Sequence, residues 1–173
     1  MVTIRGRAKI NLTLDVLGLR DDGYHEIATV MQSLALADTL TLTREESGIA
    51  LTVDMPGLET DERNLAWRAA ALVIEHCGIR SGVRIDIVKR IPVAAGLAGG
   101  SADAAAVLRG MNELYALGLS DAELCALGAQ IGSDIPFSLM GGTVFATGRG
   151  ENMKPLADFP KIHVVLAKPP VDV

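Results

Sequence analysis

A glycine-rich run between a strand-like and a helix-like segment constrains this sequence most. It covers residues 92–103 and places Gly96, Gly99 and Gly100 within five residues. Glycine lets a backbone approach a ligand closely, and the start of the following helix leaves N–H groups without intrahelical partners. Together these features predict a phosphate-binding site. A flexible strand-to-helix connection is the alternative that the loop alone leaves open.

The spacing of the glycines excludes three familiar nucleotide-binding loops. No lysine follows them, as a P-loop requires, and they do not fit the G-x-G-x-x-G pattern of a Rossmann fold. The glycine loop of a protein kinase lies between two strands, whereas this run precedes a helix-like segment. A phosphate site here must therefore belong to another class of fold.

Composition and charge favour a globular protein that binds neither nucleic acid nor a membrane. Hydrophobic residues make up 49% of the 173-residue chain and aromatic residues only 3%, so the core must consist of small aliphatic side chains. The net charge of −5 argues against nucleic-acid and membrane-surface binders, which usually carry a basic excess. Cys77 and Cys125 lack metal-ligand spacing, and no signal peptide is evident; both points predict a cytoplasmic protein with reduced thiols.

Hydrophobic periodicity predicts an α+β fold. Alternation over residues 9–16 predicts a half-buried strand, with Lys9 and Asn11 one period apart on its polar face. Further strands are expected at 27–36, 40–43, 49–53, 83–88, 143–147 and 162–167, and helices at 64–77, from the glycine run to about 117, at 120–131 and just after 132. Because strands and helices do not alternate regularly, we expect a mixed, mostly antiparallel sheet with helices on one face.

Four separated segments resemble the GHMP kinase superfamily. They are, in chain order, Ala8-Lys9-Ile10-Asn11-Leu12, Asp22-Gly23-Tyr24-His25, the glycine run ending at Ser101, and Gly132-Ser133-Asp134-Ile135-Pro136-Phe137. The resemblance covers essentially the whole chain, and the first two segments are similar to the branch whose acceptor is a cytidine-diphosphate-linked polyol. It implies a two-layer sandwich like domain 2 of ribosomal protein S5, with ATP as phosphoryl donor and Mg²⁺ as helper.

The resemblance also implies the domain boundaries. Residues 1–157 correspond to the N-terminal ATP-binding domain of the family, and residues 158–173 to the first strand of a C-terminal domain that is otherwise missing. That second domain walls the site in the family. We therefore expect the 173-residue chain to expose apolar surface and to have little kinase activity of its own.

Catalysis is assigned by the resemblance to Asp134 and Lys9. Phosphoryl transfer needs a group to accept the proton of the acceptor hydroxyl, and a carboxylate at a helix start stays ionised, so Asp134 is the expected base. Lys9 is expected to keep Asp134 ionised and to stabilise charge on the transferring group. Local sequence alone favours Asp134 as a simple helix N-cap, and Lys9 as a solvated lysine on an open sheet face.

The remaining site residues follow from the same resemblance. Asn11 is expected to hydrogen-bond the acceptor, Tyr24 to stack on its cytosine and His25 to bond the base edge; a surface amide, a tyrosine that caps the core and a loop histidine are the alternatives. ATP is expected to bind Pro92, Val93, Ala94, Ala95, Gly96, Leu97, Ala98, Gly99, Gly100 and Ser101. Its triphosphate is expected on Gly96, Leu97, Gly99, Gly100 and Ser101, where Ser101 is alternatively an N-cap. The adenine is expected near Asn64, Leu65 and Lys89. No residue is assigned to a metal, so Mg²⁺ is expected to arrive with the nucleotide.

The sequence leaves three functions open. The first is an ATP-dependent kinase for the cytidine-linked acceptor, and the second is a mevalonate, homoserine or sugar kinase of the same superfamily. The third is a non-enzymatic RNA-binding module with the S5-like fold. The last would require a basic face, which the net charge of −5 does not favour.

Overall fold

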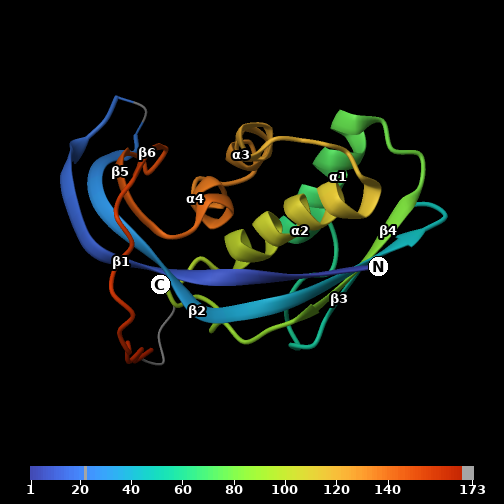
Figure 1. Cartoon of the computed structure of the whole chain (residues 1–173), viewed down its shortest axis with the longest axis horizontal. Helices are drawn as coiled ribbons and strands as arrows, with labels where there is room; N and C mark the ends of the chain where they lie inside the picture. The colour runs from blue at the N-terminus through green and yellow to red at the C-terminus, as the bar shows by residue number, and fades with distance from the viewer. Residues whose placement is uncertain (22, 169–173) are drawn as a thin grey trace.

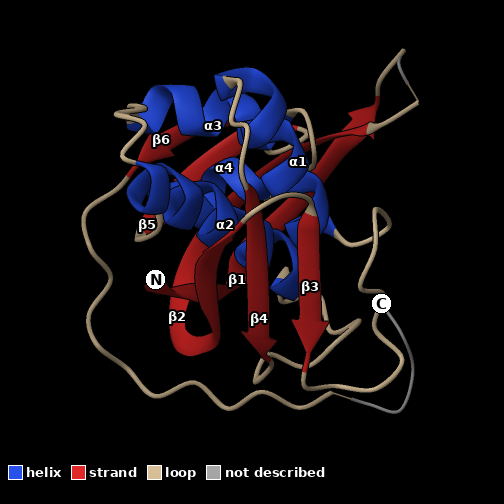
Figure 2. Cartoon of the chain, turned by 90° about the vertical axis from the view of Figure 1, so that its right-hand side faces the viewer, coloured by secondary structure: helices blue, strands red, loops and turns tan. Residues whose placement is uncertain are grey.

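The computed structural model describes residues 1–21 and 23–168, and in this part of the chain four helices cover one face of a six-stranded sheet (Figures 1 and 2). The strands are Val2–Leu19 (β1), His25–Glu45 (β2), Ile49–Val53 (β3), Gly82–Val88 (β4), Thr143–Gly148 (β5) and Asn152–Pro155 (β6). The helices are Leu65–Cys77 (α1), Gly99–Tyr115 (α2), Asp121–Ala129 (α3) and Ile135–Met140 (α4). The predicted α+β fold is confirmed, although β6 was not expected. Asp22 of the second motif lies outside the described residues.

One long strand, β2, organises the sheet. It pairs antiparallel with β1 along one edge, and along the other edge with β5 through residues 27–32 and with β4 through residues 39–45. β3 adds to β4 in parallel and β6 adds to β5 antiparallel, so the sheet is mixed and mostly antiparallel. The prediction of separate strands at 27–36 and 40–43 was wrong, because β1 pairs with both parts of β2 and holds them in one strand.

The strand pairing along one edge of β2 is interrupted between β5 and β4, and we call this interruption the seam. Residues 33–38 of β2 pair with no strand on that edge within the described chain. On the opposite edge the register of β1 shifts, since Arg7 pairs with Ala37 but Lys9 pairs with Ser33. Such irregularities bend a strand and redirect its side chains, and they are frequent beside active sites. Lys9 therefore lies on β1 at the seam.

Small side chains let the helices approach the sheet closely. α1 buries Ala66, Ala69, Ala70 and Val73, and the alanine-rich α2 packs beside it on Leu40, Leu42 and Ile85 of the sheet. The contact of β1 with α2 requires glycine, because a Cβ at Gly6 would lie 2.7 Å from the carbonyl oxygen of Ala102. The first turns of α2 are thus fixed directly against β1.

The distal half of β1 does not bury its predicted apolar face. Ile10 and Leu12 are partly buried, but Leu14 and Val16 are 54% and 61% exposed. The β1–β2 hairpin extends beyond the helices at this end of the molecule (Figure 1), so no helix covers those side chains. The prediction of a half-buried strand over residues 9–16 therefore holds only for its first half.

Residues 156–168 form neither helix nor strand, so the predicted strand at 162–167 is wrong. The segment begins beside β5, where the backbone N–H of Phe159 donates to Thr143 Oγ1. Beyond that point Ile162 and Val165 are exposed, and residues 156–168 pair with none of the described strands. The assignment of residues 158–173 to a second domain stays a prediction, and residues 169–173 lie outside the described part. No helix in the described ranges is long and apolar enough to cross a membrane.

Candidate functional site

The glycine run borders a cavity of about 460 Å³, a volume in the range of small-ligand sites. Every residue predicted to hold ATP lines this cavity except Ser101. Lys9 and Asp134 line it as well. The structure thus places the glycine run and both expected catalytic residues around one space.

Left-handed backbone conformations shape the loop, and only one of them belongs to a glycine. Gly96 has φ of 69°, while Ala94 and Ala98 have φ of 50° and 54°. Gly99 and Gly100 instead begin α2, where a Cβ on Gly99 would lie 3.2 Å from the Ile91 side chain. Gly99 therefore serves close packing, whereas a Cβ on Gly100 would meet only Leu65 at an ordinary 3.5 Å, and alanines take two of the turn positions.

The start of α2 is open to a ligand. Ala98 occupies the N-cap position and provides no side-chain cap, so Ser101 is not the N-cap. Gly99 and Gly100, whose N–H groups have no partner within the helix, both line the cavity. This geometry is typical of phosphate sites at helix N-termini.

An ion pair joins Lys9 of β1 to Asp134 at the start of α4. Lys9 Nζ lies 3.6 Å from Asp134 Oδ2, and the lysine is mostly buried while Asp134 is 38% exposed. The backbone N–H of Lys9 also donates to the carbonyl oxygen of Leu97 at 3.1 Å, which ties β1 to the glycine run. Asp134 makes no side-chain cap bond, so its carboxylate is not used as an ordinary helix cap.

Asn11 orients Lys9 and does not line the cavity. Lys9 Nζ donates to Asn11 Oδ1 at 2.9 Å, and Asn11 Nδ2 donates to Thr29 Oγ1 at 2.7 Å. Thr29 in turn donates to the carbonyl oxygen of Thr13. This chain of hydrogen bonds fixes the lysine ammonium, and the predicted contact of Asn11 with an acceptor stays a prediction.

Tyr24 lines a second cavity, of about 430 Å³, on the other side of the turn that carries Asp134. The lining includes Ser133 and Pro136, the near neighbours of Asp134 on either side, and the guanidinium of Arg149 lies 4.7 Å from the centre of the Tyr24 ring. An aromatic ring beside an arginine suits a base and its phosphates. His25 lies exposed at the start of β2 and lines neither cavity, so its predicted role finds no geometric support.

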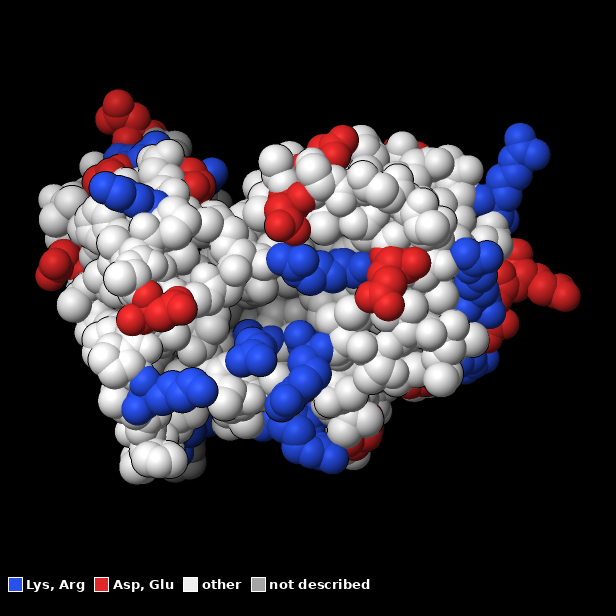
Figure 3. Space-filling view, viewed as in Figure 1, with Lys and Arg blue, Asp and Glu red and all other residues white. Residues whose placement is uncertain are grey.

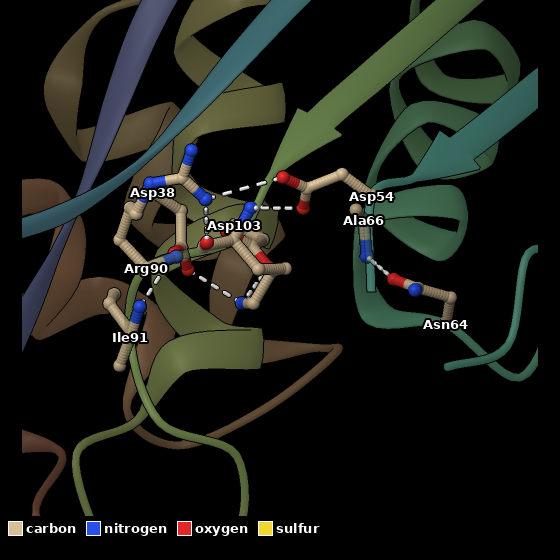
Figure 4. A network of polar contacts seen from close by, with 8 residues as sticks. Asp38, Asp54, Asn64, Ala66, Arg90, Ile91 and Asp103 are labelled. Atoms are coloured by element: carbon tan, nitrogen blue, oxygen red, sulfur yellow. Dashed lines mark hydrogen bonds and ion pairs between the residues drawn. The ribbon is translucent and has the colours of Figure 1, made fainter. Parts of the chain in front are cut away.

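Beneath the first cavity lies a buried cluster of Asp38, Lys89 and Asp103 (Figure 4). Lys89 Nζ donates to Asp38 Oδ2 at 2.5 Å and to Asp103 Oδ2 at 2.7 Å. The Lys89 ammonium is thus already paired, and its predicted contact with adenine stays a prediction. Sequence reasoning gave Asp38 no role, since an aspartate after Ala37 looks like a break between strands.

Asp38 holds the chain where it leaves the sheet for the glycine run. Its Oδ1 accepts from the backbone N–H groups of Arg90 and Ile91 at 2.5 and 2.9 Å. These bonds replace strand pairing at the seam. The entry to the loop is therefore positioned by a side chain of β2.

The cluster has unusual protonation equilibria. Burial raises the pKa of Asp103 to about 7, although the neighbouring Lys89 ammonium acts to lower it. Burial also acts to lower the pKa of Lys89, but the carboxylates of Asp103 and Asp38 outweigh it and the pKa is raised. Lys89 thus stays charged, while Asp103 titrates near neutral pH.

The loop before α1 forms the far wall of the cavity. Asn64 caps α1, as predicted, by accepting from the Ala66 backbone N–H at 2.9 Å, and its Nδ2 donates to the Glu59 carbonyl oxygen. Glu59 and Arg63 join Asn64 and Leu65 in the lining. Sequence reasoning missed these two charged residues because they stand in a polar loop without periodicity.

The described residues do not fit a resident magnesium ion. They contain no group of three His, Cys, Asp or Glu side chains that could hold a metal. Asp103 is buried, its Oδ2 is already paired with Lys89 and its Oδ1 is enclosed by protein. The arrival of Mg²⁺ with the nucleotide stays a prediction.

A separate groove of about 570 Å³ collects basic side chains on the face seen in Figure 3. Its lining includes Arg5, Arg7, Arg109 and Lys161, with one carboxylate, Asp158. Arg109 is itself paired with Asp121 at 3.3 Å. The acidic chain thus carries one locally basic surface.

Comparisons with known proteins agree with this geometry. Residues 64–142 match the family model of the GHMP kinases N terminal domain. The chain is 59% identical to 4-diphosphocytidyl-2-C-methyl-D-erythritol kinase of Synechococcus sp. (strain JA-2-3B'a(2-13)) over 96% of its length and 54% of that protein. It is 54% identical to the kinase of the same name from Shouchella clausii (strain KSM-K16), over 98% of this chain and 57% of the relative.

Solved structures show the same fold. A crystal structure of 4-(cytidine 5'-diphospho)-2C-methyl-D-erythritol kinase superposes with a TM-score of 0.79 at 43% identity, over 90% of this chain and 55% of that one. Methanococcus jannaschii mevalonate kinase superposes with a TM-score of 0.71 at 14% identity, over 90% of this chain and 56% of that one, which shows the fold alone. This chain spans a little over half the length of these relatives. In its motifs, its fold and its sequence, the chain matches the N-terminal domain of the GHMP kinases.

Proposed function

We propose that a protein containing this chain transfers the γ-phosphoryl group of ATP to the 2-hydroxyl of 4-diphosphocytidyl-2-C-methyl-D-erythritol. The observation that carries this proposal is the Lys9–Asp134 pair at 3.6 Å, on the cavity that the glycine run borders. The name shared by relatives at 54–59% identity supports the choice of acceptor. The unpaired cysteines, Cys77 and Cys125, agree with a cytoplasmic location for this reaction.

In the proposed mechanism the backbone N–H groups at the start of α2 bind the triphosphate. Asp134 accepts the proton of the 2-hydroxyl as its oxygen attacks the γ-phosphorus, and the bond from phosphorus to the β-γ bridging oxygen breaks to release ADP. Lys9 stabilises the negative charge on the transferring group, and Asn11 holds the ammonium in place. The cytidine would occupy the Tyr24 cavity, and Mg²⁺ would accompany the nucleotide.

An ADP-release assay tests the proposal on a protein of the relatives' length. We expect release that depends on the cytidine-linked acceptor and is at least 100-fold slower with mevalonate, homoserine or a sugar. A preference for one of the latter would assign a different kinase of the superfamily. Release without any acceptor would identify an ATPase and contradict the proposal.

The basic groove favours RNA binding as a second candidate function. Its four cations could neutralise phosphates, and such binding weakens steeply as salt rises. A titration with a labelled RNA hairpin at two salt concentrations distinguishes the candidates. Binding that disappears in the double variant Arg5→Gln, Arg7→Gln would support the RNA candidate, whereas no binding at low salt would exclude it.

A further inference from the structure

Asp103 has a buried carboxylate oxygen that bonds to nothing in the described part of the chain. The residue is 5% exposed and lines the nucleotide cavity, and its Oδ2 accepts from Lys89 while its Oδ1 has no partner. A buried polar atom without a hydrogen bond is costly and is rare in native structures. Packing alone does not explain an aspartate at this place in α2.

The charges of the buried cluster do not balance. One ammonium faces two carboxylates, so the cluster carries a charge of −1 when all three groups are ionised and is neutral with one added proton. Asp38 accepts from Lys89 through Oδ2 and from two backbone N–H groups through Oδ1, so both of its oxygens are hydrogen-bonded. Asp103 accepts only from Lys89, so the added proton belongs on Asp103.

The position of Asp103 couples this proton to the cavity. Asp103 lies in the early turns of α2, behind the N–H groups that face the ligand space. Those N–H groups attract phosphate, whereas an ionised Asp103 repels it. The other ionisable groups around the cavity are Lys9 of β1, Glu59 and Arg63 before α1, and Asp134 before α4, while Asp54 accepts from the Lys89 backbone N–H.

We propose that Asp103 takes up a proton from solvent when nucleotide phosphates enter the cavity. The proton forms an O–H bond on Asp103, Lys89 remains charged and paired with Asp38, and the cluster becomes neutral beneath the incoming negative charge. This inference rests on the proposed nucleotide site. Burial places the pKa of Asp103 at about 7, so the uptake operates near neutral pH.

Calorimetry measures the proposed proton directly. MgADP is titrated into the 173-residue chain at pH 7.5 in two buffers of different ionisation enthalpy, and the difference in heat gives the number of protons bound. A rise of one unit in the pKa of Asp103 on binding corresponds to an uptake of about half a proton. We expect the variant Asp103→Asn to lose this uptake, and the control Asp121→Asn, an exposed aspartate in the first turn of α3, to keep it.

The affinity for MgADP should depend on the same protonation of Asp103. From pH 6 to pH 8 the wild-type chain is expected to lose about fivefold more affinity for MgADP than Asp103→Asn does, because a pKa that rises by one unit on binding strengthens binding about ninefold at pH 6 but only about twofold at pH 8. If Asp103 had only a structural role, the substitution would change the affinity for MgADP by the same factor at every pH. Titration of the nucleotide phosphates contributes equally to both proteins and cancels in the comparison.

The outcomes separate the proposed role of Asp103 from the proposed nucleotide site. Binding with equal proton uptake in the wild type and Asp103→Asn would overturn the role of Asp103 and leave the nucleotide site intact. No binding by any of the proteins between pH 6 and pH 8 would overturn the nucleotide site and this inference with it. Carboxyl ¹³C NMR of the wild type gives an answer that needs no variant, since the Asp103 signal must shift toward the protonated form on addition of MgADP.

Discussion

Lys9 of the first motif and Asp134 of the last motif form an ion pair of 3.6 Å at the seam of the sheet. The pair exists because a register shift in β1 presents Lys9 there and because α4 begins directly after Asp134. The same lysine is bonded through its backbone to the glycine run. Three segments distant in sequence are therefore held in one fixed geometry before any ligand arrives.

The variant Asp134→Asn tests the base. In a protein of the relatives' length we expect ATP affinity within about threefold of the wild type and a turnover about 100- to 10,000-fold lower, because the amide cannot accept the acceptor proton. ADP-release kinetics and nucleotide titration measure the two effects separately. Asp86→Asn, on β4 beside Thr52, serves as the control with normal turnover. Near-normal turnover of Asp134→Asn would remove the carboxylate from the mechanism.

Replacement of Ala98 by glycine should stabilise the fold. Ala98 has φ of 54°, a conformation that costs an L-residue about 1–2 kcal/mol, while the added freedom of glycine in the unfolded chain offsets part of the gain. We expect the free energy of unfolding of Ala98→Gly to rise by about 0.5–1 kcal/mol in urea denaturation. Ala106→Gly, inside α2, is the matched control and should lower stability by about 1 kcal/mol. Destabilisation in both variants would show that Ala98 carries no strain.

The contact between β1 and α2 should tolerate no added methyl group. The Cβ in Gly6→Ala would lie 2.7 Å from a backbone oxygen of Ala102, and backbone cannot move aside cheaply. We expect a loss of about 2–3 kcal/mol in the free energy of unfolding, measured by urea denaturation. Gly18→Ala in the same strand meets nothing within 4 Å and should change stability by less than about 0.5 kcal/mol.

The stability of the chain should depend on pH through Asp103. The pKa of Asp103 is about 7 in the folded state against 3.8 for an exposed aspartate, so the folded state binds more protons between these values. The contribution of Asp103 to the free energy of unfolding therefore falls as the pH rises from about 4 to 7. Relative to the wild type, Asp103→Asn should gain about 2–4 kcal/mol over this range. If the free energies of unfolding of the wild type and Asp103→Asn differed by the same amount at every pH, this result would contradict the raised pKa.

The 173-residue chain itself should turn over acceptor at least 100-fold more slowly than a protein of the relatives' length. The Tyr24 cavity and the exposed apolar residues of the hairpin have no covering element in the described structure, so the acceptor would be poorly positioned. ADP release by both proteins under identical conditions measures the ratio. Equal rates would show that these residues suffice for catalysis.

Much of the fold could be predicted from the sequence because its elements carry strong local signals. Asn64 caps α1 and Ser120 forms a capping box with Glu123, both as their spacing indicates. The continuity of β2 could not be predicted, since Asp38 breaks the apolar pattern and its hydrogen-bond partners come from residues 89–91. The alternation of apolar and polar residues also could not predict that the helices leave Leu14 and Val16 uncovered.

The candidate site divides in the same way. Gly96 and the helix start after it could be located from composition, and Asp134 from a motif. The left-handed alanines, Ala94 and Ala98, could not, because alanine carries no signal for positive φ. The pairing of Lys89 with two carboxylates was equally hidden, since it depends on three elements that meet only in the folded molecule.

The seam at residues 33–38 determines how the two ends of the sheet can move relative to each other. There β2 lacks a neighbour on one edge and its pairing with β1 is irregular, so bending costs least at this point. A hinge at that place would carry β5 and α4 on one side and β4 with the glycine run on the other. Lys9 is joined to both sides, by its ion pair with Asp134 and by its backbone bond to Leu97, so these two contacts oppose such bending where the sheet itself resists it least.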